Sequence, residues 1–137
     1  MKVLTMYTTT FSFVPALKNS DFADENAEAK EFSDCILAFI QIEAEDEEKD
    51  VLSREKKLVN HLKWVLRKNN TQRVILHSFA HLSESKASSA FSKAVFDQAE
   101  KRLENAGIET AQTPFGYFLD LTIKAPGFSL ARIWAAL

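Results

Sequence analysis

A continuous apolar run in the first third of the chain constrains the fold most strongly. This run is Asp34-Cys35-Ile36-Leu37-Ala38-Phe39-Ile40-Gln41-Ile42, which is too short for a long helix and lacks polar alternation. Such a run is typical of a strand that is covered on both faces. Cys35, the only cysteine, lies inside the run, so we expect a buried thiol in a reducing compartment.

Two helices and several short strands are predicted around this central strand. Apolar residues recur at helical spacing after Asp50 or Ser53, either of which can cap a helix, and again after Ser88. In chain order we expect strands over 2–8 and 11–14, a connection over 18–30, the strand 34–42, a helix over 52–66, a strand over 73–76, a helix over 88–104, strands over 108–113 and 117–124, and a short C-terminal helix over 130–136. This interleaving predicts a single α/β domain, residues 1–137, with a mixed sheet.

Charge and hydropathy exclude some classes of function. The net charge is −2, which argues against broad nucleic-acid affinity but is compatible with a local basic rim that holds the end of one RNA strand. No apolar stretch approaches the roughly 20 residues needed to span a bilayer, so we expect no membrane partner and a cytoplasmic protein. The acidic block 43–50 is expected to be a solvated loop that leads into a helix.

His81 is the strongest chemical candidate because of its position. It follows the carboxyl end of the predicted strand 73–76 and precedes a serine-rich loop that opens a helix, and ligands bind at that edge in open α/β folds. One interpretation is that His81 orients a substrate or a water molecule; the other is a buried histidine bonded to the backbone. His77 shares its face, but no carboxylate or thiol completes a ligand spacing, and we expect no metal.

The turn Pro114-Phe115-Gly116-Tyr117 is the second candidate. Proline and glycine bracket an aromatic residue between two predicted strands. Either the turn forms a pocket wall whose main-chain groups contact a small ligand, or it is a plain hairpin turn with Phe115 as a core residue. No glycine-rich phosphate loop and no strand–turn–helix serine motif is present, so neither a nucleotide fold of that kind nor a serine hydrolase is predicted.

The two candidate segments together resemble the editing domain of archaeal-type threonyl-tRNA synthetases. The motifs are His-Ser-Phe-Ala-His-Leu-Ser (77–83) and, about thirty residues later, Gln-Thr-Pro-Phe-Gly-Tyr (112–117). The segment 38–42 resembles the central strand of that family, and the resemblance spans nearly the whole chain. It implies a fold similar to D-aminoacyl-tRNA deacylases and a homodimer. It also implies hydrolysis of seryl-tRNA wrongly made on threonine tRNA, assisted by the 2′-hydroxyl of the RNA.

The resemblance also implies the site residues. The 3′ end of the aminoacyl-tRNA would bind in a pocket read largely by main-chain atoms, with His81 as the catalytic residue and no cofactor. The residues expected to contact the substrate are Ile42, Ala80, Phe115, Gly116, Tyr117 and Phe118.

Three departures from the family pattern leave the chemistry open. Leu119 stands where the family usually has a functional lysine, and Phe118 stands where it commonly has tyrosine. Gly-His-Pro-Leu-Ala-Glu becomes the segment 127–132, so that Arg132 replaces an acid. The chain is therefore either an editing-type hydrolase or a non-catalytic binding homologue, freestanding or trimmed. A purely structural role would be favoured if Phe118 and Phe128 filled the pocket.

Overall fold

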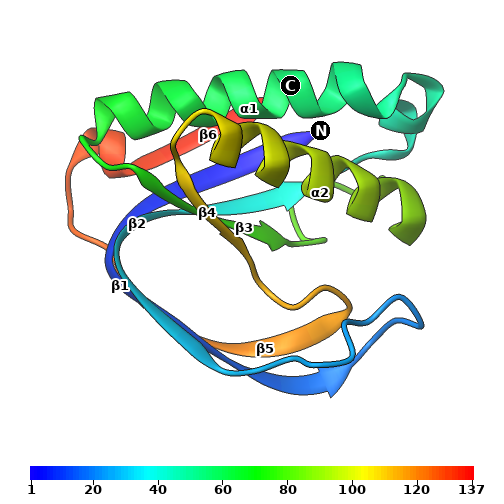
Figure 1. The fold of residues 1–137 in the computed structure, drawn as a ribbon, viewed down its shortest axis with the longest axis horizontal. Helices are drawn as coiled ribbons and strands as arrows, with labels where there is room; N and C mark the ends of the chain where they lie inside the picture. The colour runs from blue at the N-terminus through cyan, green and yellow to red at the C-terminus, as the bar shows by residue number, and fades with distance from the viewer.

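A single curled sheet of six strands carries both helices (Figure 1). The structure is a computed structural model that describes all of residues 1–137. Its elements are β1 (Lys2–Lys18), β2 (Lys30–Gln41), the 3₁₀ helix η1 (Ala44–Glu48), α1 (Val51–Lys68), β3 (Arg73–Ser78), α2 (Ser89–Asn105), β4 (Glu109–Gln112), β5 (Tyr117–Lys124), the 3₁₀ helix η2 (Ser129–Ala131) and β6 (Arg132–Ala136). The main path through the sheet is β4-β3-β2-β1-β5, and β6 also pairs with β1.

The sheet is mixed, as the sequence predicts. β3 pairs in parallel with both β2 and β4, whereas β1 is antiparallel to β2, β5 and β6. Strong bending of β1 and β2 brings β5 opposite the other strands, so that the sheet is open on one side (Figure 1). The parallel strands β2 and β3 end beside each other, and this edge positions the site described below.

The central strand is covered on both faces, as its apolar run predicts. Ile36, Ala38 and Ile40 belong to the larger core cluster, which includes buried residues of α1 and α2. Leu37 and Phe39 alternate with them and belong to a second cluster on the other face. Cys35 is fully buried in that second cluster, where burial raises the pKa of its thiol, so the expectation of a buried thiol is confirmed.

Both long helices form where local signals predict them. The Asp50 carboxylate accepts a hydrogen bond from the Ser53 N–H (2.7 Å) at the start of α1. The Ser88 hydroxyl accepts one from the Phe91 N–H (3.3 Å) at the start of α2. These caps satisfy N–H groups that the first helical turn leaves without partners. Neither helix is both long enough and apolar enough to cross a membrane.

The expected N-terminal strand pair is wrong, because β1 is one strand of 17 residues. Its middle is Thr8-Thr9-Thr10, which is β-prone and contains none of the residues that favour turns. The strand also has partners along nearly its full length. β2 pairs with one edge, and the other edge pairs with β6 over residues 2–6 and with β5 over residues 10–18.

The expected short C-terminal helix is also wrong. Ser129–Ala131 forms a single 3₁₀ turn, and Arg132–Ala136 forms strand β6. A lone helix of this length is unstable without extensive packing, whereas pairing satisfies the edge of β1 that β5 leaves uncovered. Ile133 and Ala135 face inward and alternate with exposed residues, which is the period of a strand.

The acidic block is not the solvated loop that its composition suggests. Glu43 and Asp46 are buried, and η1 places both beside the N-terminal ammonium group, at 2.7 Å and 3.0 Å respectively. Asp46 also pairs with buried Arg54 at 2.7 Å. Buried charges are tolerated only when they are paired, so the fold requires negatively charged side chains at positions 43 and 46.

Candidate functional site

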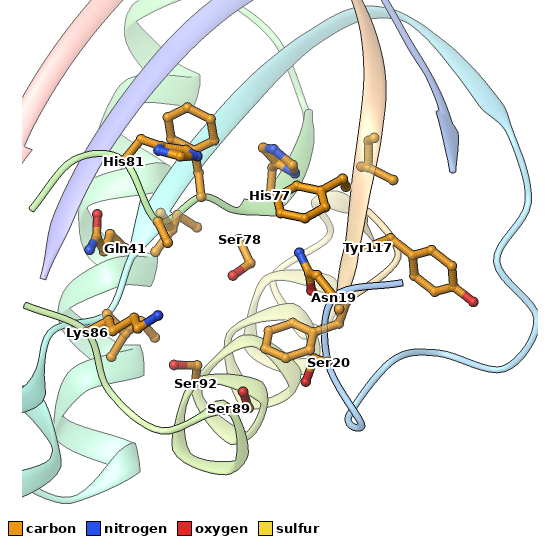
Figure 2. A pocket seen from close by; sticks show the side chains of 18 of the residues that line it. Asn19, Ser20, Gln41, His77, Ser78, His81, Lys86, Ser89, Ser92 and Tyr117 are labelled. Carbon is orange, nitrogen blue, oxygen red and sulfur yellow. The ribbon is translucent and has the colours of Figure 1, made fainter. Parts of the chain in front are cut away.

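An open cleft of about 650 Å³ lies at the carboxyl ends of β2 and β3 (Figure 2). The start of α2 and the segment 114–119 form its other walls. All seven residues predicted from the sequence line this one cleft: Ile42, Ala80, His81, Phe115, Gly116, Tyr117 and Phe118. Segments that are far apart in the sequence therefore meet at the edge where ligands bind in α/β folds.

His81 is exposed at the rim of the cleft, so its interpretation as a buried histidine is wrong. Its ring lies edge-on against Phe79, with 4.9 Å between the ring centroids, and its nitrogens have no hydrogen-bond partner within the chain. Phe79 in turn packs against Phe39 at 4.8 Å. The imidazole thus packs on one side against a partly buried aromatic residue of the second core cluster and is free to contact a ligand on the other side.

His77 is buried and has a different role. Its Nδ1 lies 2.8 Å from the Thr113 hydroxyl, which links the end of β3 to the residue before Pro114. Burial lowers the pKa of His77 to about 4, so the ring is neutral near pH 7. No group of three or more histidine, cysteine, aspartate or glutamate side chains in the chain is arranged to hold a metal ion.

The buried side chain of Gln41 shapes the loop that carries His81, a role that the sequence did not indicate. Its Oε1 accepts hydrogen bonds from the N–H groups of Leu82 (2.6 Å) and Ser83 (2.8 Å). Its Nε2 donates to the carbonyls of Ser83 (2.8 Å) and Ser85 (2.9 Å). All the hydrogen-bonding groups of the amide are therefore used to fix one loop in one conformation.

Two neighbouring N–H groups of this loop have no partner within the chain. The Phe79 N–H donates to the Ile40 carbonyl (3.0 Å), and those of Leu82 and Ser83 donate to Gln41. The N–H groups of Ala80 and His81, between them, make no hydrogen bond in the protein. Since both residues line the cleft, these donors are available to an oxygen atom of a ligand.

The segment Phe115–Tyr117 packs against the loop 19–24. The Phe115 N–H donates to the Asp24 carboxylate (2.8 Å), and the Phe115 and Gly116 carbonyls accept from the N–H groups of Asp24 (3.1 Å) and Asn19 (2.8 Å). The Tyr117 hydroxyl donates to the Asp24 carbonyl (3.0 Å) and is directed away from the middle of the cleft (Figure 2). The Phe115 N–H and the carbonyls of Phe115 and Gly116 therefore hold the loop 19–24, whereas the Gly116 N–H makes no hydrogen bond within the chain, and contact of this segment with a ligand stays a prediction.

Phe115 itself has the core role that the alternative interpretation assigned to it. Its side chain is buried, and its ring lies 6.2 Å from that of Phe96 on α2. Gly116 has φ +79°, and a Cβ atom there would lie 2.7 Å from the Cα of Ala23. Only glycine fits this close approach without displacing the loop 19–24.

The positions that depart from the family pattern fall in different places. Leu119 is half-buried, lines the cleft and packs on the second core cluster, so this wall is apolar. Arg132 does not line the cleft; it donates a hydrogen bond to the Pro126 carbonyl (3.1 Å), so the expected reversal of charge is not found in the cleft of the single chain. Phe118 is 57% exposed, and Phe128 lies beside Tyr7 outside the cleft. The two phenylalanines therefore do not fill the pocket.

The fold shows the structural class of the chain. A solved structure described as c-Myc DNA Unwinding Element Binding Protein matches with a TM-score of 0.65 over 100% of this chain and 99% of that chain, at 11% sequence identity, which shows the fold alone. The architecture is D-aminoacyl-tRNA deacylase-like, a mixed α/β fold with a curled sheet and two helices, as predicted except that β1 is a single strand and the C-terminal segment forms β6.

The family then follows from the sequence match. The model of the archaea-specific editing domain of threonyl-tRNA synthetase matches residues 1–137, so the chain belongs to this family. Threonine–tRNA ligases of Thermofilum pendens and Methanopyrus kandleri are each 26% identical over 97% of the chain, and that of Nanoarchaeum equitans is 30% identical over 86%. The chain spans only 22%, 21% and 18% of these ligases.

Proposed function

We propose that this chain hydrolyses the ester bond of a mischarged aminoacyl-tRNA, with the seryl ester on threonine tRNA as its substrate. The observation that carries the proposal is the convergence of the seven predicted site residues on one open cleft, in a chain of this editing-domain family. The cleft is large enough for an aminoacylated nucleoside and is not filled by the chain's own side chains.

The reaction needs a positioned water molecule and stabilisation of the developing negative charge. The water oxygen attacks the ester carbonyl carbon, the bond from this carbon to the ribose oxygen breaks, and a water proton passes to that oxygen. The products are the free amino acid and a tRNA with a free terminal hydroxyl. In our proposal the N–H groups of Ala80 and His81 bind the carbonyl oxygen, and the His81 ring orients the water together with the neighbouring ribose 2′-hydroxyl.

The apolar wall of the cleft limits the catalytic groups that the protein itself supplies. Leu119 offers neither a charge nor a hydrogen bond at the position where the family usually has a lysine. The loss of one positioned polar group commonly reduces a rate by about 100-fold. We therefore expect turnover that depends strongly on the RNA hydroxyl, and we assign the contacts to the substrate to Ile42, Ala80 and Phe118 with the segment 115–117.

A homodimer in the cytoplasm, where aminoacyl-tRNAs are used, completes the proposal. Strand β6 pairs only with β1, so its outer edge has no partner within the chain. Trp134 on this strand is 58% exposed. A free edge beside a large exposed aromatic residue is suited to association with a second copy. The molar mass in solution, measured by light scattering, tests this part: a dimer is expected, and a monomer at micromolar concentration would contradict it.

The experiment that tests the function is a deacylation assay on a panel of tRNAs. The panel contains seryl-tRNA and threonyl-tRNA on threonine tRNA together with other mischarged pairs. The wild-type protein should release serine preferentially, and His81→Ala should lower the rate by about 100-fold. His61→Ala, on α1 outside the cleft, is the matched control and should retain the wild-type rate. The absence of turnover with every substrate would refute catalysis. If an aminoacyl-adenosine analogue still bound, the protein would be a non-catalytic binding homologue.

A further inference from the structure

The charge of the cleft differs from that of the whole chain. The chain has 19 acidic and 17 basic residues, yet no aspartate or glutamate is among the residues that line the cleft. Lys86 is the only lysine or arginine among them. His77 is neutral near pH 7 because burial lowers its pKa to about 4. The lining therefore carries a positive charge in a chain that is negative overall, and this favours an anionic ligand.

The Lys86 ammonium group has no partner within the chain. It forms no ion pair within 4 Å and no hydrogen bond, whereas Lys93 on the nearby helix α2 is paired with Asp97 at 2.7 Å. The backbone on both sides of Lys86 is nevertheless fixed. The Ser85 carbonyl accepts from Gln41 (2.9 Å), and the Ala87 N–H donates to the Ile42 carbonyl (2.9 Å). The backbone around Lys86 is thus fixed, whereas its ammonium group is unpaired within the chain.

Two free hydroxyl groups lie on the same side of the cleft. Figure 2 shows the Lys86 ammonium directed into the cleft above Ser92 and Ser89, with His81 at another part of the rim. Neither serine hydroxyl makes a hydrogen bond within the chain. An ammonium group and hydroxyl donors are suited to the oxygens of a phosphate group, and no carboxylate competes for them.

We propose that Lys86, with the hydroxyls of Ser89 and Ser92, binds the phosphate on the 5′ side of the terminal nucleotide. This inference rests on the proposed function, because it assumes that the cleft holds an aminoacylated adenosine. The ester then lies toward Ala80 and His81, and the phosphate lies toward α2. Lys86 is a binding and positioning residue here: it holds the nucleotide in register and does not touch the reacting atoms.

The test compares two non-hydrolysable ligands that differ only in the phosphate. They are a seryl-adenosine analogue with an amide in place of the ester, and the same compound with a 5′-phosphate. Their dissociation constants are measured by calorimetry for the wild-type chain, residues 1–137, and for Lys86→Gln. Lys101→Gln is the matched control, because Lys101 is exposed on α2 and does not line the cleft.

We expect the phosphate to strengthen binding to the wild-type chain about tenfold, and less at high salt. Lys86→Gln should abolish this gain while leaving the affinity for the unphosphorylated compound unchanged, and Lys101→Gln should behave as the wild type. If the gain persisted in Lys86→Gln, if both compounds weakened equally, or if the wild type bound both equally, the phosphate assignment would be wrong and the proposed function would stand. Binding of neither compound to the wild type would overturn both proposals.

Discussion

Replacement of Gln41 by methionine should release the loop that carries the site. Methionine nearly matches glutamine in length and shape, so the change removes the amide group while leaving the packing of β2 almost intact. The four hydrogen bonds to the loop are lost, and the N–H groups of Leu82 and Ser83 and the carbonyls of Ser83 and Ser85 are left without their partner. The strand itself should persist, because its backbone pairs with β1 and β3.

The magnitude follows from those four bonds. A hydrogen bond between a side chain and the backbone contributes about 1 kcal/mol to stability, and a buried group left without a partner costs about as much again. The loop is partly exposed, so water replaces some of the lost contacts. We therefore expect a loss of about 2–4 kcal/mol in the free energy of unfolding, or a local opening of the loop at a similar cost.

Hydrogen exchange distinguishes a local effect from a global one. The amides of Leu82 and Ser83 should exchange roughly 30-fold faster in Gln41→Met, which corresponds to about 2 kcal/mol of lost protection. Urea unfolding gives the global free energy, and Gln98→Met, an exposed position on α2, serves as the control. If exchange at Leu82 and Ser83 were unchanged while the variant remained folded, Gln41 would not hold the loop and our account of the site would fail.

Two further predictions concern the turn and the buried ions. Gly116→Ala should lower the free energy of unfolding by at least ~2 kcal/mol in thermal or urea unfolding, because φ is +79° and the new Cβ would lie 2.7 Å from the Cα of Ala23. Gly107→Ala is the control, because Gly107 has φ +80° but open space around it, so the change should cost only the ~1–2 kcal/mol of the backbone conformation. Equal losses in the two variants would contradict the steric argument. Burial raises the pKa of Glu43, but hydrogen bonds from the N-terminal ammonium, Ser83 and Lys2 outweigh burial and lower the pKa to about 2. The ionised carboxylate therefore stabilises the fold above pH 4.5, and this contribution is lost as the pH falls from 4.5 toward 2. Urea unfolding at several pH values should show a smaller acid loss in Glu43→Gln, and identical profiles would refute this contribution.

Local signals explain which parts of the fold could be predicted. The side chains of Asp50 and Ser88 cap the helices that follow them, and such contacts span only a few residues. The continuity of β1 and the strand β6 depend instead on pairing between residues 2–18 and residues 117–136, which are distant in the sequence. Composition alone could not show this pairing, and the C-terminal segment was consequently predicted as a helix.

The same difference between local signals and long-range contacts decides which site residues could be predicted. His81 and the turn around Gly116 were found because each lies at the end of a predicted strand and together they resemble a known family. Gln41 was missed because a glutamine within an apolar run gives no sign that it bonds to residues more than 40 positions away. Lys86 was missed because only the folded structure shows which walls of the cleft lack carboxylates.

A crystal structure with the non-hydrolysable seryl-adenosine analogue tests the central claim most directly. We predict that the analogue occupies the cleft, with its carbonyl oxygen within hydrogen-bond distance of the N–H groups of Ala80 and His81 and its adenosine against the wall formed by residues 115–118. An analogue bound elsewhere, or an empty cleft at saturating concentration, would contradict the assignment of this cleft as an aminoacyl-tRNA editing site.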